Sequence, residues 1–280
     1  MVNIKKKIVT LKDRIIYNIG RPEMRVLPGS LAFFFFLTLI PLFALLIYFV
    51  SIFNLPYSSL SNIFSEYFPK GVINILEAIN VKIDLNVNII VFIISAMILA
   101  SNGTHSMILV SNQIYRIKDR GYFTRRIKAL IMMIVVVALL LFILFIPVFG
   151  NMIFKLIFIT DRTSTLKSIL LSIYSILKYP ISFIIIYTFV RLLYIMAPDK
   201  RIRRESIEYG TLFTTVSWIF LTKIYSVYVE NFTNYTTFYG GVASILILML
   251  WLYFLSYIFV LGMALNVSRD EIIELKKNND

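Results

Sequence analysis

The sequence predicts an all-α polytopic membrane protein with six transmembrane helices and with its N and C termini in the cytoplasm. Three observations lead to this prediction. Of the 280 residues, 59% are hydrophobic and 15% are charged, whereas about a quarter are charged in soluble domains. Six apolar segments are long enough to cross a bilayer, and the Lys and Arg residues are concentrated in alternate connections between them.

Each predicted span has the length that a bilayer demands. A crossing helix needs about 20 mostly apolar residues, because each residue rises about 1.5 Å through about 30 Å of hydrocarbon. The segments that meet this need are residues 30–53, 87–110, 129–150, 168–197, 206–229 and 241–266. We expect them to form one membrane domain over residues 1–280. Residues 54–86 carry apolar side chains at helical spacing and are expected to form an extracytoplasmic amphipathic segment.

The basic residues set the predicted orientation. Lys and Arg number 20 in the amino-terminal segment, the second and fourth connections and the tail, but only 5 in the other connections. Basic connections stay on the cytoplasmic side, so both termini are expected there. We therefore interpret the net charge of +13 as a topology signal that also attracts anionic lipid headgroups, and we expect no nucleic-acid partner.

The composition does not favour an enzyme. Metal-dependent hydrolysis needs clustered carboxylates or histidines, but the sequence has one histidine, His105, and 15 acidic residues without ligand spacing. The absence of Cys excludes disulfides and thiolate metal sites. No P-loop, nucleophile elbow or zinc-protease motif is present. We expect no catalytic residues, no metal and no cofactor.

Two lysines inside predicted spans are candidates for function. An ionisable side chain at the centre of a span costs about 2.5 to 3.5 kcal/mol, so such residues need an explanation. Lys178 and Lys223 would lie at similar depth if the fourth and fifth spans are antiparallel neighbours. With no acidic residue deep in a span, they would form a pocket for phosphate or carboxylate headgroups. The alternative, which stays open, is that both snorkel to the membrane surface, as we expect of Arg191, or that they donate to carbonyls at helix ends.

A polar run in the second span is the other candidate, and it comprises Ser101, Asn102, Gly103, Thr104, His105 and Ser106. Two interpretations stay open. The run packs helices closely, with His105 hydrogen-bonded in the core, or it lines a water-filled cavity. The candidate substrate-binding residues are therefore Lys178, Lys223, Ser101, Asn102, Thr104 and His105.

Several motifs resemble those of the YihY/BrkB family of bacterial inner-membrane proteins. The first span resembles the family's Leu-Ala-Tyr-Tyr stretch with a following hydroxyl residue and proline, although Phe33 and Phe34 replace the tyrosines. Asn112 and Tyr115, ahead of a basic run, resemble its Asn-x-x-Tyr motif. Further matches lie at Pro198, Gly210, Trp218, Tyr225, Tyr239, Gly240, Trp251, Leu252 and Tyr253.

The resemblance extends over nearly the whole chain, with one departure. The family often has Gly-Ala-Glu-Leu-Asn where this chain has Gly262-Met263-Ala264-Leu265-Asn266, so no role for that glutamate is carried over. The resemblance implies six spans in the bacterial plasma (inner) membrane and a role in the cell envelope, for which lipid export has been suggested. A ribonuclease label attached to some members is generally regarded as mistaken.

Two functions follow as hypotheses. The first is the transport or flipping of an anionic lipid or other amphiphile, with membrane lipids as partners. The second is a non-transporting scaffold that recruits envelope machinery through its basic loops. The sequence leaves open whether the chain forms a homo-oligomer or binds envelope proteins.

Overall fold

The computed structural model describes the backbone over residues 12–52, 89–118, 121–157, 164–231 and 234–277. It describes side chains over residues 12–48, 90–118, 121–141, 180–228 and 245–275. These parts of the chain contain a short helix over residues 12–19, six long helices and no strand. The predicted all-α class is thereby confirmed.

Each long helix overlaps one expected span. The helices are α2 (Glu23–Ile52), α5 (Ile89–Ile114), α6 (Tyr122–Ile157), α7 (Ser164–Met196), α8 (Arg204–Asn231) and α9 (Asn234–Lys277). Helical hydrogen bonding continues past the apolar segments, and α9 runs for 44 residues, into the charged tail. The expected amphipathic segment at residues 54–86 lies outside the described residues.

Three helices in the described part are long and apolar enough to cross a membrane: Glu23–Tyr48, Ile90–Ile114 and Ile245–Leu275. Pro180–Met196 is a shorter apolar helix. α8 is not among the three, because its hydroxyl residues and Lys223 lower its hydropathy. The expected count of six spans therefore stays a prediction.

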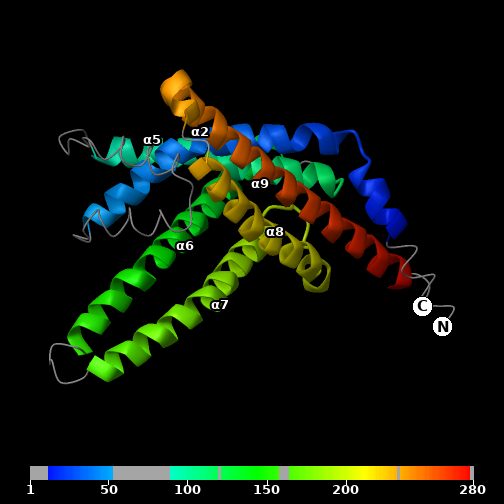
Figure 1. The fold of residues 1–280 in the computed structure, drawn as a ribbon. Helices are drawn as coiled ribbons and strands as arrows, with labels where there is room; N and C mark the ends of the chain where they lie inside the picture. Colours follow the sequence, from blue (N-terminus) through cyan, green and yellow to red (C-terminus); the bar gives the residue numbers. More distant parts are fainter. Residues whose placement is uncertain (1–11, 53–88, 119–120, 158–163, 232–233, 278–280) are drawn as a thin grey trace, which may run out of the picture.

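The helices form a splayed bundle (Figure 1). α2 packs against α5 and α9, and α8 packs against α9 and α7. α6 begins against α5 and then runs beside α7, away from the other four helices. Two clusters of apolar side chains hold the packed part together, one around Leu31, Ile108 and Phe259 and the other around Phe43, Leu46 and Trp251.

The basic connections meet at one end of this bundle, which we call the basic end. Arg14 of the short helix pairs with Glu271 of α9 at 3.2 Å, and Lys200 of the α7–α8 connection pairs with Glu274 at 3.1 Å. Arg21 donates to the last carbonyl of α5. The first and last described segments therefore lie at the same end as the connections that follow α5 and α7.

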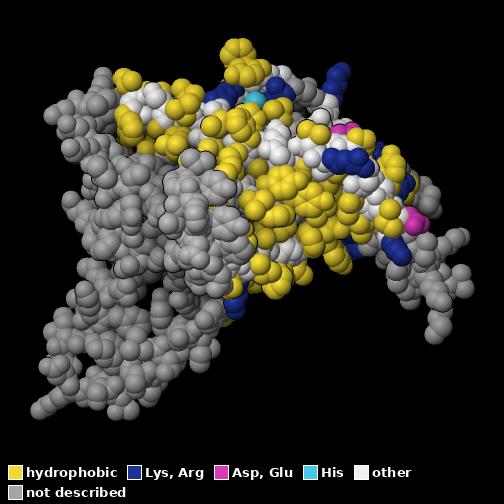
Figure 2. Space-filling view, turned by 45° about the horizontal axis from the view of Figure 1, so that its top comes forward, with side chains coloured by type: hydrophobic (Ala, Val, Ile, Leu, Met, Phe, Trp, Pro, Cys, Tyr) yellow, Lys and Arg dark blue, Asp and Glu magenta, His cyan; other side chains and the backbone are white. Residues whose placement is uncertain are grey.

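The surface of the described helices is largely apolar. Figure 2 shows a broad hydrophobic face with the charged side chains gathered towards its edges. On α8 the exposed apolar side chains recur at helical spacing, at Leu212, Val216, Phe220, Ile224 and Val227. Such a large apolar surface is typical of a helix bundle in lipid.

Candidate functional site

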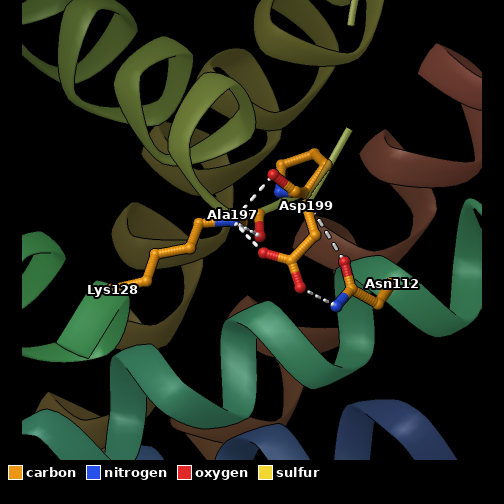
Figure 3. Close-up of polar contacts among 5 residues, drawn as sticks. Asn112, Lys128, Ala197 and Asp199 are labelled. Atoms are coloured by element: carbon orange, nitrogen blue, oxygen red, sulfur yellow. Dashed lines mark hydrogen bonds and ion pairs between the residues drawn. The ribbon is translucent and has the colours of Figure 1, made fainter. Parts of the chain in front are cut away.

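An ion pair between a partly exposed lysine and a buried aspartate lies where α6 meets the connection between α7 and α8. The Nζ of Lys128 is 2.7 Å from Oδ1 of Asp199, whose side chain is 3% exposed. Asn112 of α5 approaches the same carboxylate from the other side, donating to Oδ2 at 2.6 Å and accepting from the Asp199 N–H at 2.9 Å (Figure 3). Both carboxylate oxygens have a donor, so this charge is compensated inside the protein.

Basic side chains also complete two helix ends. The last carbonyls of a helix have no partner within it, and the last turns of α5 and α7 contain no basic residue. The Nζ of Lys128 donates to the carbonyl oxygens of Ala197 and Pro198 at 2.9 and 2.7 Å. Arg21 donates to the carbonyl of Ile114 at 3.0 Å. These two cations stabilise helix ends, in addition to their predicted part in the topology.

α8 and α9 approach closely at a pair of glycines. A Cβ on Gly210 would clash with the carbonyl oxygen of Gly262 and with Oδ1 of Asn266. That Oδ1 accepts the N–H of Gly210 at 2.8 Å. Small residues allow such close backbone approach in membranes, so the buried polar groups here serve helix packing.

A second buried carboxylate lies one turn further along α9. Asp270 accepts a hydrogen bond from Ser206 at the start of α8, at 2.9 Å, where the helix dipole favours negative charge. Nearby, the buried hydroxyl of Tyr115 has no hydrogen-bond partner among the described residues. Burial, together with the negative charge of Asp270, raises the pKa of Tyr115 above its ordinary value, so its hydroxyl is neutral at physiological pH.

The inner face of the predicted polar run packs against neighbouring helices. Ser101 donates to a carbonyl of its own helix at 2.7 Å, and Thr104 donates to the carbonyl of Ala129 in α6 at 2.7 Å. A Cβ on Gly103 would lie 2.8 Å from Oγ1 of Thr38 in α2. These contacts are those of close helix packing. Substrate binding by Ser101 and Thr104 stays a prediction.

Asn102 and His105 lie on a partly exposed face of α5, beside the start of α6. Arg126 donates from NH1 to Oδ1 of Asn102 at 2.9 Å and from NH2 to the carbonyl of Ile98 at 2.8 Å. The ring of His105 meets that of Tyr122 edge-on, with centroids 6.1 Å apart. We call Asn102, His105, Tyr122 and Arg126 the α5–α6 junction. Figure 2 shows the histidine at the surface with basic side chains on both sides.

His105 differs from the expected core histidine. It is partly exposed, and its Nε2 has no hydrogen-bond partner among the described residues. The reason is that α6 begins beside the middle of the apolar segment Ile90–Ile114, where Tyr122 meets His105 and Arg126 meets Asn102. The polar run therefore faces the basic start of a neighbouring helix.

Arg126 was assigned to a basic loop of the scaffold hypothesis and not to the substrate-binding residues, because the third span was expected to begin at residue 129. The helix in fact begins at Tyr122, directly after Gly121, whose φ of +94° allows the chain to turn. The sequence does contain a clue. Tyr122 and Phe123 form an aromatic pair of the kind that marks a membrane interface, and their exposed fractions are 60% and 80%.

The two candidate lysines lie on the neighbouring helices α7 and α8, and the structure describes the side chain of one of them. The side chain of Lys178, in α7, lies outside the described part, and Lys223 is exposed on α8. α7 and α8 contact each other near the basic end, where Arg191 pairs with Glu208 at 2.6 Å and Tyr187 donates to the same carboxylate. From there the two helices diverge (Figure 1). The shared lysine pocket stays a prediction, and Arg191 has an acidic partner that we did not expect.

Metal ligands do not cluster in the described part of the chain, which holds no group of three or more His, Cys, Asp or Glu able to bind an ion. The buried acids Asp199 and Asp270 have different hydrogen-bond partners. The expected absence of a metal, a cofactor and catalysis stays a prediction.

Comparison with known families shows where the chain belongs. Residues 15–280 match the profile of the family described as Virulence factor BrkB. The chain belongs to the BrkB family. The motifs that resemble YihY/BrkB proteins are thereby explained, and the predicted family is confirmed.

Relatives of this BrkB-family chain carry two kinds of name. YfkH of Bacillus subtilis (strain 168), named as a ribonuclease-like protein, is 28% identical over 242 residues, which are 85% of this chain and 87% of the relative. A UPF0761 membrane protein of Alteromonas mediterranea is 34% identical over 87 residues, 31% of this chain and 29% of the relative. A UPF0761 membrane protein of Idiomarina loihiensis is 27% identical over 85 residues, 30% of each chain. No solved structure matches the chain. The membrane names agree with the apolar helices.

Proposed function

We propose that this BrkB-family chain is a multi-pass protein of the bacterial plasma membrane that binds and moves an anionic amphiphile such as a lipid. Each of its six long helices crosses the membrane, and the basic end lies in the cytoplasm. Three helices of sufficient length and apolarity support this topology. The convergence of the basic connections with the first and last described segments at one end supports it as well.

One observation carries the functional part of the proposal. Arg126 lies beside the middle of the apolar α5, and its described partners, Oδ1 of Asn102 and the carbonyl of Ile98, are neutral. A partly exposed cation beside an apolar helix, without a compensating acid among the described residues, is a candidate for function. Lys223 is a second exposed cation for which the described residues provide no acidic partner.

The scaffold hypothesis is the second candidate, and the exposed basic side chains of the connections favour it. Arg116, Lys118 and Arg201 are exposed at the basic end, where a protein partner in the cytoplasm would reach them. Neither candidate function includes catalysis.

A vesicle assay separates these candidates. The full chain is reconstituted in phosphatidylcholine vesicles that contain a trace of fluorescent phosphatidylglycerol, and dithionite bleaching reports how much of the probe reaches the outer leaflet. We expect protein-dependent movement of this probe and much slower movement of fluorescent phosphatidylcholine. The variant Arg126→Gln tests the junction, and the double variant Lys178→Gln, Lys223→Gln tests the lysine pocket. No movement, combined with an envelope partner lost on charge reversal of Arg116 and Lys118, would favour the scaffold.

A further inference from the structure

The contacts of Arg126 point to a class of ligand. We propose that Arg126, Asn102 and the first turn of α6 bind the phosphate of an anionic glycerophospholipid in the leaflet that faces the basic end. This inference rests on the proposed function for the orientation of the chain, but it does not require that the lipid be moved.

The first step concerns charge. Lys128, two residues after Arg126, has its counter-charge in Asp199. No described carboxylate contacts Arg126, and the first turn of α6 contains no acidic residue. The amino end of a helix carries a partial positive charge, which an acidic residue in the first turn would reduce and an arginine increases. An anion from outside the protein would compensate the charge of the helix end and the charge of Arg126.

The second step concerns hydrogen-bond donors. NH1 and NH2 of Arg126 each give one N–H to a neutral oxygen, of Asn102 and Ile98. The guanidinium has further N–H groups in the same plane, a geometry that suits two oxygens of a phosphate. Of the first N–H groups of α6, that of Arg125 donates to the carbonyl of Gly121 at 3.3 Å, and those before it have no acceptor within the helix. Helix amino ends commonly bind phosphate. Asn102 therefore orients the guanidinium and leaves donors for a ligand.

The third step concerns depth and surroundings. Tyr122 and Phe123 are strongly exposed at the first turn of α6, and exposed aromatic rings are enriched at headgroup level. Arg126 lies one turn further into the helix, and its long side chain can still reach the headgroup level. Exposed apolar side chains on both helices lie close in sequence to the contact residues, at Ile98, Leu99, Ile127 and Ile131. Acyl chains would cover this apolar surface, whereas a free phosphate ion would not.

Lipid binding by the full chain tests the assignment. The protein is extracted in mild detergent and titrated with phosphatidylglycerol, and native mass spectrometry reports the bound fraction. Arg126→Gln removes the cation. Asn102→Asp keeps Arg126 but places a carboxylate beside it, so the charge is compensated inside the protein. We expect both variants to bind phosphatidylglycerol about tenfold more weakly than wild type, because Arg126→Gln removes one charge-assisted interaction and the carboxylate of Asn102→Asp competes with the phosphate for the guanidinium.

Arg201→Gln is the matched control, since it removes one exposed charge at the basic end and should bind as wild type does. Thermal unfolding checks that each variant is folded, and Asn102→Asp, which hardly changes side-chain volume, decides the test if Arg126→Gln does not fold. Unchanged binding by Asn102→Asp would overturn the assignment. An equal loss of phosphatidylglycerol binding in Arg201→Gln would also overturn it. So would binding of inorganic phosphate alone by the wild-type protein. Binding lost in both junction variants, without lipid movement in vesicles, would retain the site and reject transport.

Discussion

Lys128 and Arg126 are two residues apart in α6, carry the same charge and have different kinds of partner. At the basic end, Lys128 contacts the buried carboxylate of Asp199 and two carbonyls at the end of α7. At the α5–α6 junction, Arg126 contacts two neutral oxygens, and no described carboxylate reaches it. The difference shows that a count of basic residues does not reveal where their counter-charges lie. A cation compensated inside the protein is structural, whereas one compensated outside can bind a ligand.

Removal of Lys128 should have the largest effect on stability. Lys128→Ala leaves Asp199 as a buried charge without a cation, and breaking such a pair costs about 3 to 5 kcal/mol in the free energy of unfolding. Thermal or denaturant unfolding in detergent measures the loss. The double variant Lys128→Ala, Asp199→Ala should recover part of it, because the uncompensated carboxylate is gone. If Lys128→Ala were as stable as wild type, Lys128 would not have the structural role that distinguishes it from Arg126.

Asn112→Ala should have an intermediate effect. The variant keeps the ion pair but leaves one carboxylate oxygen and the N–H of Asp199 without their present partners. Unsatisfied buried groups cost about 1 to 3 kcal/mol, so the free energy of unfolding should fall by about 2 kcal/mol. Asn112→Asp, which places a second carboxylate beside Asp199, should be less stable than Asn112→Ala; the reverse order would show that the site tolerates negative charge.

Arg126→Gln should change little in lipid-free detergent. Its present partners are neutral and glutamine can still donate to one of them, so we expect a loss of about 1 kcal/mol or less. Added phosphatidylglycerol should raise the Tm of wild type and leave that of the variant nearly unchanged, because a ligand stabilises only the state that binds it. A loss as large as that of Lys128→Ala in the absence of lipid would make the junction a structural contact.

Lys200→Ala should have the smallest effect. Lys200 and Glu274 form an ion pair at 3.1 Å, but their side chains are 53% and 46% exposed. Solvent-exposed pairs contribute about 0 to 1 kcal/mol, and salt screens them. Unfolding with and without added salt should show hardly any difference between variant and wild type. A clear loss at low salt would indicate that charges at the basic end act as a network.

Much of the fold could be predicted because local patterns govern it. Each of the six apolar segments overlaps a helix, and the distribution of Lys and Arg predicts which connections share one side of the membrane. Helix ends were less predictable. α6 begins at Tyr122 and not near residue 129, because its helical hydrogen bonding extends into the basic residues before the apolar segment. A search for apolar residues does not detect that part of the helix.

The candidate site was predicted only in part. The polar run in α5 was identified by composition, but its residues divide between two faces. Thr104 contacts α6 inside the bundle, whereas Asn102 and His105 meet the partly exposed α5–α6 junction. Arg126 could not be chosen among the basic residues, since its distinguishing feature is the lack of an acidic contact among the described residues. That property depends on residues distant in the sequence.

The helical class, the apolar segments and the asymmetry of charge follow from the order of residues along the chain, because hydrophobicity and charge are properties of each segment. The family follows from it as well, through motifs in chain order. Which cations have partners in the protein depends instead on how the helices pack, since the acids and carbonyls that compensate these cations come from other parts of the chain. The packing of α6 against α5 also brings Arg126 to Asn102, near the middle of α5, although the two residues are 24 positions apart in the sequence.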